Sequence, residues 1–317
     1  MPATPKPHMI VALAGCGGDE WLSVMSAVKL TCLGNLLRGM TLLGTDAGQS
    51  DSLSPPHERV WAKAMGLGTG FGVDSLADGL IPSAAYSNNA KPAEACAFIT
   101  LCHWSMGREH ATLTDPQTLE LTEADSRTLL AAMQPYFATE GITLHYVEPT
   151  LWLAKGNVFV SLPTASLDRV LGRNVDRWLP ASTALKLLQN EMQMLLYTHP
   201  VNDLRSMHGL RSVNSFWISG SGALAEPATD HSHIKVTRAL AQAAFSNNWT
   251  AHAQAWIQLD AEDIAQLLAR QNCGETVRIS LCGESNSLTF ETAQRGFFAQ
   301  MKSVLRPQRP IDVLKQL

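Results

Sequence analysis

Residues 199–222 gather the polar side chains of this chain that are best suited to chemistry. The stretch passes from a helix end at His199 through a polar loop that contains Arg205, and then into an apolar run and a glycine-rich turn. An arginine guanidinium can bind phosphate or carboxylate through two parallel hydrogen bonds, so the pattern predicts an anion-binding site at a strand end. The candidate ligand-binding residues are Arg173, Asn174, His199, Asn202, Arg205 and Asn214.

The same residues also fit an architectural role, which we favour. Asn202 and Asn214 can hold loop backbone groups by side-chain hydrogen bonds, and His199 can cap the C-terminus of the helix before it. Arg205 then bridges Asp203 and backbone carbonyl groups. Catalytic residues remain unknown, because Ser219-Gly-Ser-Gly does not match the G-x-S-x-G nucleophile pattern and neither serine has an assignable base.

Asp230-His231-Ser232-His233 comes closest to a metal-binding pattern. Short Asp-His and His-x-His pairs are common by chance, and this one opens an expected helix, where Asp and Ser are natural caps. The other histidines show no H-E-x-x-H spacing. We therefore expect no metal site and no cofactor.

Two glycine clusters fail as phosphate-binding loops. Gly15-x-Gly17-Gly18 follows an expected strand, but Glu20 stands where a dinucleotide loop has its third glycine, and a carboxylate there would repel a pyrophosphate. The glycines at 66–72 follow an expected helix and are better explained as its end and a loop.

The composition excludes several classes of partner. The 317 residues carry 24 Lys and Arg against 28 Asp and Glu, a net charge of −4, with no block of like charge. Nucleic-acid binding is therefore not expected. The apolar run at 9–15 is too short to span a membrane, and six cysteines without a C-x-x-C pair indicate reduced thiols, so we expect a cytoplasmic protein.

Periodicity predicts an α/β protein with a mixed β-sheet flanked by helices and a loop-rich N-terminal third. Strands are expected at 9–15, 95–104, 142–147, 151–154, 158–162, 213–218, 276–281 and 287–290. Helices are expected at 19–38, 56–65, 122–138, 165–171, 182–198, 234–246, 260–271 and 292–304. Residues 45–56, 66–72 and 83–92 are expected to be irregular.

We expect residues 1–317 to form a single α/β domain, with a possible subdivision into a loop-rich part, 1–94, and a core, 95–317. The run 213–218 has large apolar groups on both faces, which predicts an interior strand. Trp152, Trp178 and Trp217 are expected in the core, because no interleaved basic residues accompany them.

His199-Pro-Val-Asn, followed by a strand ending in Gly220-x-Gly222, resembles archaeal-type, cofactor-independent phosphoglycerate mutases. The likeness to these enzymes covers 195–222. The chain resembles RpfE-type regulatory proteins of proteobacteria over most of 95–300. That second resemblance rests on Leu162-Pro-Thr, Leu167-Asp, Leu171-Gly-Arg-Asn and Trp178-Leu-Pro.

The mutase resemblance implies the alkaline-phosphatase superfamily, in which two metal ions activate a Ser or Thr nucleophile and an Asp after the first strand is a metal ligand. Here that position reads Ala14-Gly-Cys-Gly-Gly18. We therefore expect a regulatory or binding protein of RpfE type, with a phosphorylated small molecule or a protein as partner. A metal-dependent phosphoglycerate mutase or phosphatase-like enzyme is the first alternative, and a purely protein-binding regulator is the second.

Overall fold

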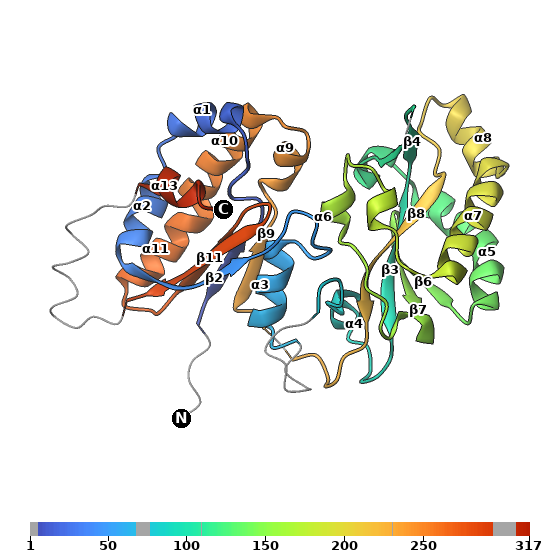
Figure 1. Cartoon of the computed structure of the whole chain (residues 1–317), viewed down its shortest axis with the longest axis horizontal. Helices are drawn as coiled ribbons and strands as arrows, with labels where there is room; N and C mark the ends of the chain where they lie inside the picture. Colours follow the sequence, from blue (N-terminus) through green and yellow to red (C-terminus); the bar gives the residue numbers. More distant parts are fainter. Residues whose placement is uncertain (1–5, 68–76, 109, 230, 294–308) are drawn as a thin grey trace. The chain divides into compact units, whose positions relative to one another are not determined.

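The computed structural model describes residues 6–67, 77–108, 110–229, 231–293 and 309–317. The chain forms two compact units (Figure 1). Unit 1 comprises Met1–Asp51, Pro55–Met65 and Asp230–Leu317, and unit 2 comprises Ser52–Ser54 and Gly66–Thr229. Their boundaries differ from the expected subdivision at 94/95, because the end of the chain returns to unit 1. Whether the whole chain folds as one domain stays a prediction.

Unit 1 is built on a five-stranded mixed sheet in the order β2-β11-β10-β1-β9. The strands are β1 (His8–Val11), β2 (Met40–Ala47), β9 (Ile234–Thr237), β10 (Arg278–Cys282) and β11 (Asn286–Thr292). β1 is parallel to both β9 and β10, while β10, β11 and β2 are antiparallel. β1 is buried along its whole length, as expected of a strand with a neighbour on each side and helices over the sheet.

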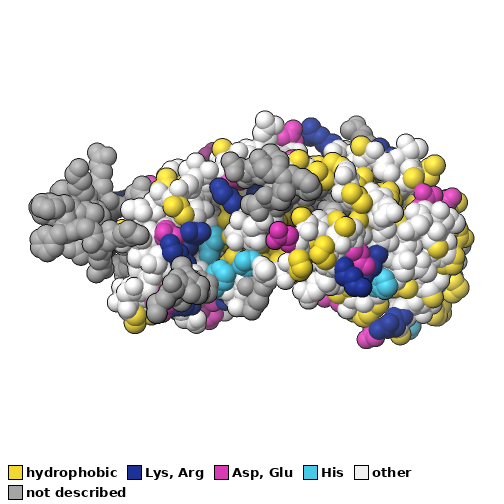
Figure 2. All heavy atoms as spheres, turned by 90° about the horizontal axis from the view of Figure 1, so that it is seen from below, with side chains coloured by type: hydrophobic (Ala, Val, Ile, Leu, Met, Phe, Trp, Pro, Cys, Tyr) yellow, Lys and Arg dark blue, Asp and Glu magenta, His cyan; other side chains and the backbone are white. Residues whose placement is uncertain are grey.

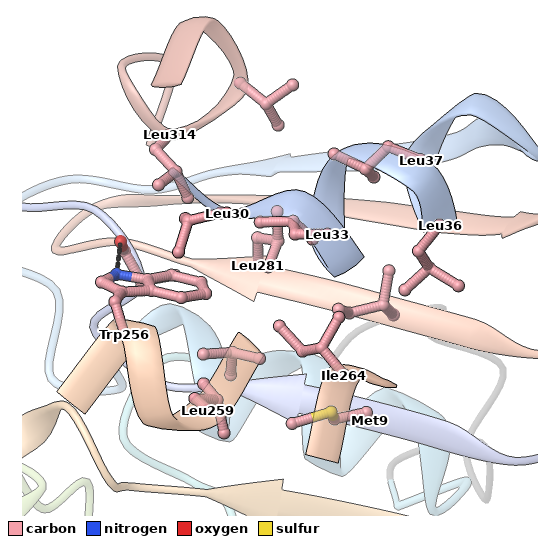
Figure 3. Close-up of a cluster of buried hydrophobic side chains, with 14 of the residues drawn as sticks. Met9, Leu30, Leu33, Leu36, Leu37, Trp256, Leu259, Ile264, Leu281 and Leu314 are labelled. Carbon is pink, nitrogen blue, oxygen red and sulfur yellow. Dashed lines mark hydrogen bonds between the residues drawn. The ribbon is translucent and has the colours of Figure 1, made fainter. Parts of the chain in front are cut away.

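The helices of unit 1 are mostly short. They are α1 (Asp19–Ser26), α2 (Thr31–Arg38), α3 (Pro56–Ala64), α9 (Ala241–Phe245), α10 (Trp249–Leu259), α11 (Ala265–Asn272) and α13 (Pro310–Leu314). A π-helical turn, Asp260–Ile264, joins α10 to α11. Figure 3 shows the core, in which leucines of α2 pack with Trp256 and Ile264, while Trp256 Nε1 donates to Ala14 O at 3.0 Å.

The expected helix 19–38 is wrong, because the helix is interrupted between the end of α1 at Ser26 and the start of α2 at Thr31. The start of α2 has no local side-chain cap. Instead, the Asp260 carboxylate accepts hydrogen bonds from Cys32 N at 3.0 Å and Leu33 N at 2.7 Å. A buried carboxylate from the distant π-helical turn therefore satisfies two backbone N–H groups that the helix leaves unpaired.

Unit 2 contains a four-stranded antiparallel sheet in the order β6-β7-β3-β8 and a separate hairpin, β4-β5. The strands are β3 (Cys96–Cys102), β4 (Trp104–Met106), β5 (Ala111–Leu113), β6 (Thr143–Glu148), β7 (Leu151–Lys155) and β8 (Ser215–Gly222). The mixed α/β class is confirmed by the two sheets together with their helices.

The helices of unit 2 are α4 (Ser83–Ser87), α5 (Glu123–Thr139), α6 (Leu167–Val170), α7 (Thr183–Tyr197) and α8 (Pro200–Met207). Side chains cap the starts of α5 and α7, since Thr122 Oγ1 accepts from Asp125 N and Ser182 Oγ accepts from Leu185 N. α5 and α7 bury apolar stripes in one core with Trp152 and Phe216.

Trp217 is 1 % exposed, and its Nε1 donates to Ala165 O at 3.0 Å. The expected interior position of its strand is only half right. β8 is covered on both faces, but it pairs with β3 alone and lies at the edge of the sheet. Gln189 of α7 donates a hydrogen bond to Phe216 O at 2.8 Å, so a side chain pairs with a backbone carbonyl group of this edge strand.

Several local predictions are corrected. β2 occupies part of the expected loop 45–56, β9 occupies the start of the expected helix 234–246, and α4 and α8 form where loops were expected. The expected strand 158–162 is replaced by a 3₁₀ turn at Asn157–Phe159. The two strands were missed because β2 and β9 are short or exposed strands whose partners are distant in sequence. Most of the expected helix 292–304 lies outside the described residues.

Candidate functional site

An open groove of about 540 Å³ lies in unit 2. Its lining comes from the second half of α5, the second half of α7 and the start of α8: Tyr136, Glu191, Met194, Leu195, Thr198, His199 and Pro200. The groove therefore combines one carboxylate, one imidazole and two hydroxyl groups with apolar walls, and it offers no lysine or arginine. His199 is the expected site residue that lines it.

His199 begins α8, so its expected role as a cap for the end of the preceding helix is corrected. Its Nδ1 accepts a hydrogen bond from Val201 N at 3.2 Å. The ring proton of the neutral imidazole is then on Nε2, which remains available as a donor. His199 is half-buried beside the groove, where it can donate one hydrogen bond to a ligand or partner.

Asn202 is buried, and its side chain is fully used inside the fold. Its Nδ2 donates to Leu196 O and to Val213 O, both at 2.7 Å, while Oδ1 accepts from Val213 N at 2.9 Å. The amide thus ties the end of α7 to the segment that enters β8. This is the architectural role described from the sequence.

Arg205 is also buried, with its guanidinium directed at backbone carbonyl groups. Nε donates to Arg211 O at 2.9 Å, and Nη2 donates to Leu119 O. The Asp125 carboxylate lies 3.7 Å from Nη1. Burial lowers the pKa of Arg205, while Asp125 and Glu120 oppose that effect. The donors that an anion would need are largely taken by the chain itself.

Asn174 and Asn214 both lie at the β4-β5 hairpin. Asn214 accepts from Trp104 N at 2.7 Å and donates to Trp104 O at 2.9 Å, and Asn174 forms an isolated bridge with Thr112. The Asn174 side chain accepts from Asp176 N at 3.0 Å, which makes a local turn. Arg173 is exposed beside it. The contacts of the buried expected residues support the architectural interpretation, while a ligand-binding role for the six stays a prediction.

Cys16, which follows β1, and His252 of α10 form a buried contact that the sequence did not indicate. Cys16 Sγ lies 3.9 Å from His252 Nε2. That nitrogen is 3.0 Å from Leu13 O, and Trp21 Nε1 donates to His252 Nδ1 at 3.4 Å, so His252 carries its proton on Nε2. Both ring nitrogens are therefore engaged within unit 1.

The electrostatics of this pair favour neutral groups. Burial raises the pKa of the Cys16 thiol to about 12, with a further contribution from Glu284. Burial also lowers the pKa of His252, against the opposing effect of its hydrogen bond to Leu13. A thiol that stays protonated is a poor nucleophile and a poor metal ligand at neutral pH.

Metal-binding residues do not converge elsewhere in the described chain, where no three His, Cys, Asp or Glu side chains are placed to share an ion. The rings of His231 and His233 lie 5.6 Å apart, while Asp230 is outside the described residues. Ser221 Oγ bonds with Leu162 O and Thr164 Oγ1, which gives this hydroxyl a structural role. In the described residues no helix is long and apolar enough to cross a bilayer.

Comparison with known proteins gives distant structural likeness. No family model matches the chain, and no curated protein matches it. A cofactor-independent phosphoglycerate mutase from Thermoplasma acidophilum is similar at 11 % identity and TM-score 0.35, with 98 % of this chain and 99 % of that chain covered. The PH0037 protein from Pyrococcus horikoshii is similar at 10 % identity and TM-score 0.47, with 92 % and 88 % covered. Likeness at this level supports no functional inference, and no family model supports the RpfE resemblance.

Proposed function

We propose that this protein is a cytoplasmic regulatory or binding protein of RpfE type, which resembles phosphoglycerate mutases in sequence motifs but does not transfer phosphoryl groups. The observation that carries the proposal is the Cys16–His252 pair at the carboxyl end of β1. This is the position at which the mutase resemblance implies a carboxylate metal ligand.

Phosphoryl transfer with two metal ions depends on deprotonated ligands that hold the metals and on an activated nucleophile. Asp and Glu oxygens supply that environment for Mg²⁺ or Mn²⁺, and neutral imidazoles or thiolates supply it for Zn²⁺. The position after β1 offers the Cys16 thiol in place of a carboxylate, and His252 is engaged through both nitrogens. The residues present therefore do not fit a catalytic metal pair.

A protein partner is favoured over a phosphorylated small molecule. Asn202, Arg205 and Asn214 direct their polar atoms at backbone groups. In the groove, Glu191 contributes a negative charge that would repel phosphate, and the apolar Met194 and Leu195 suit a protein side chain better.

The test is a phosphoglycerate mutase assay on the purified full chain, with elemental analysis of the same sample. We expect no stoichiometric Mn, Zn or Mg and no interconversion of 2- and 3-phosphoglycerate after addition of Mn²⁺. A Cys16→Ser variant serves as the matched control. Chelator-sensitive turnover by the parent would establish the enzyme alternative and overturn the proposal, and a changed rate in Cys16→Ser would link that activity to the position after β1.

A further inference from the structure

Helix α7 has apolar residues on two opposite faces. One stripe, Leu185, Leu188, Met192 and Leu196, is buried in the core of unit 2. The other stripe, Leu187, Met194 and Tyr197, is 59 %, 70 % and 82 % exposed. A helix at the surface ordinarily presents polar residues to water on its outer face. The outer face of α7 is therefore more apolar than the solvent-exposed face of a surface helix ordinarily is.

The outer residues follow a heptad spacing. Leu187 and Met194 are seven positions apart, as are Asn190 and Tyr197. Asn190 comes three positions after Leu187. These are the a and d positions of a two-stranded coiled coil, with Leu187 and Met194 at a and Asn190 and Tyr197 at d. Asn190 is the single amide side chain in this seam.

The charges that flank this seam indicate its partner. Lys186 occupies the g position and Glu191 the following e position, and both are exposed. In a parallel pair of identical helices, each g residue lies beside the e residue five positions further along the other helix. Lys186 of each copy would then meet Glu191 of the other. An antiparallel pair would instead place Glu191 beside Glu191 of the other copy.

The surroundings of α7 are consistent with this arrangement. Glu191 and Met194 border the open groove, so the cationic end of a lysine from another copy has space to reach the carboxylate. Leu204 and Met207 of α8, the next helix in the chain, are also exposed, at 56 % and 81 %. Figure 2, a view from below, shows hydrophobic side chains among polar and charged ones along its right-hand edge.

We propose that α7 pairs in parallel with α7 of a second copy of this chain, through the seam Leu187, Asn190, Met194 and Tyr197 and the intermolecular ion pairs Lys186–Glu191. Two heptads make a short seam, so the dimer dissociates on dilution. This self-association goes beyond the proposed function, because it can be measured whether or not the protein is an enzyme.

The experiment is sedimentation equilibrium of the full chain over a concentration series, with circular dichroism to verify folding. We expect a monomer–dimer equilibrium that Met194→Glu abolishes. Met106→Glu is the matched control, because Met106 is 78 % exposed on β4 and is not part of the seam, so this variant should dimerise like the parent. A monomeric parent, or a Met194→Glu variant that still dimerises, would overturn the proposal.

A charge-exchange series tests the parallel register. Lys186→Glu and Glu191→Lys should each raise the dissociation constant by roughly threefold to thirtyfold, since each substitution affects two symmetry-related pairs. The double variant exchanges the charges and should restore the affinity of the parent. Single variants that weaken the dimer without rescue in the double variant would refute the parallel arrangement.

Discussion

The protonation of His8 should make unit 1 less stable in mild acid. His8 is 6 % exposed at the start of β1, and its Nε2 is 2.8 Å from Ser280 Oγ, which is in turn 2.7 Å from Thr289 Oγ1. Burial, together with the nearby Arg278 and His233, lowers the pKa of His8 from 6.5 to about 4, against the opposing effect of Glu291. The neutral imidazole is therefore part of a hydrogen-bonded chain that links β1, β10 and β11.

The sign of the effect follows from proton binding in the two states. Between pH 6.5 and about 4 the unfolded chain binds a proton at His8 that the folded chain does not bind, so the free energy of unfolding falls as the pH falls. The difference between 6.5 and about 4, at about 1.36 kcal/mol for each pH unit, gives at most about 3 kcal/mol. That is a large share of the ~5–15 kcal/mol that stabilises a typical domain.

The assay is hydrogen–deuterium exchange of peptides that cover β1 and β10, corrected for the intrinsic pH dependence of exchange. Protection of these strands should fall between pH 7 and pH 4.5 in the parent. The fall should be smaller in His8→Gln, with His145→Gln as the control, since His145 is exposed on β6 of unit 2. Burial also lowers the pKa of His252, so part of the acid sensitivity should remain. An identical fall in the parent and in His8→Gln would refute the reasoning.

Three substitutions test the remaining interactions by thermal and urea unfolding. Asp260→Ala should destabilise the protein by about 1–2 kcal/mol and expose the N-terminus of α2 to exchange, because Cys32 N and Leu33 N lose their acceptor; unchanged exchange there would contradict the capping role. Trp217→Ala should cost about 3–5 kcal/mol, as expected for a buried aromatic side chain, and an unchanged melting temperature would argue against it. Arg205→Lys should cost about 1–3 kcal/mol with or without phosphate, since lysine cannot bond both carbonyl groups. A variant that melts like the parent but loses a phosphate-dependent shift would instead locate an anion site.

Local elements were predictable wherever their signals lie close together in the sequence. Thr122 and Ser182 each cap the helix that follows, because a side-chain oxygen reaches a backbone N–H three residues ahead. Helix α7 and the strands β3, β6, β7 and β10 were likewise predicted from periodicity, with boundaries shifted by at most two residues. These signals need no knowledge of the rest of the fold.

The candidate site was only partly predictable. His199 was singled out from the sequence, whereas Tyr136 and Glu191 line the same groove because α5 and α7 pack side by side in one core. The pairing of Cys16 with His252 joins residues separated by 236 positions. No spacing rule connects residues so far apart, so a single sequence cannot indicate such contacts.

The sequence by itself determined the α/β class, the long helices α5 and α7 and the buried strands, because hydrophobic periodicity and capping act over a few residues. The tertiary structure alone decided the division into two units, since β1 at the start of the chain pairs with β9 and β10 near its end. The tertiary structure also decided which groups the polar side chains bind. Asn202 and Arg205 look alike in the sequence whether they bind a ligand or the backbone, and only the packing of α8 against its neighbours brings carbonyl groups within hydrogen-bonding distance.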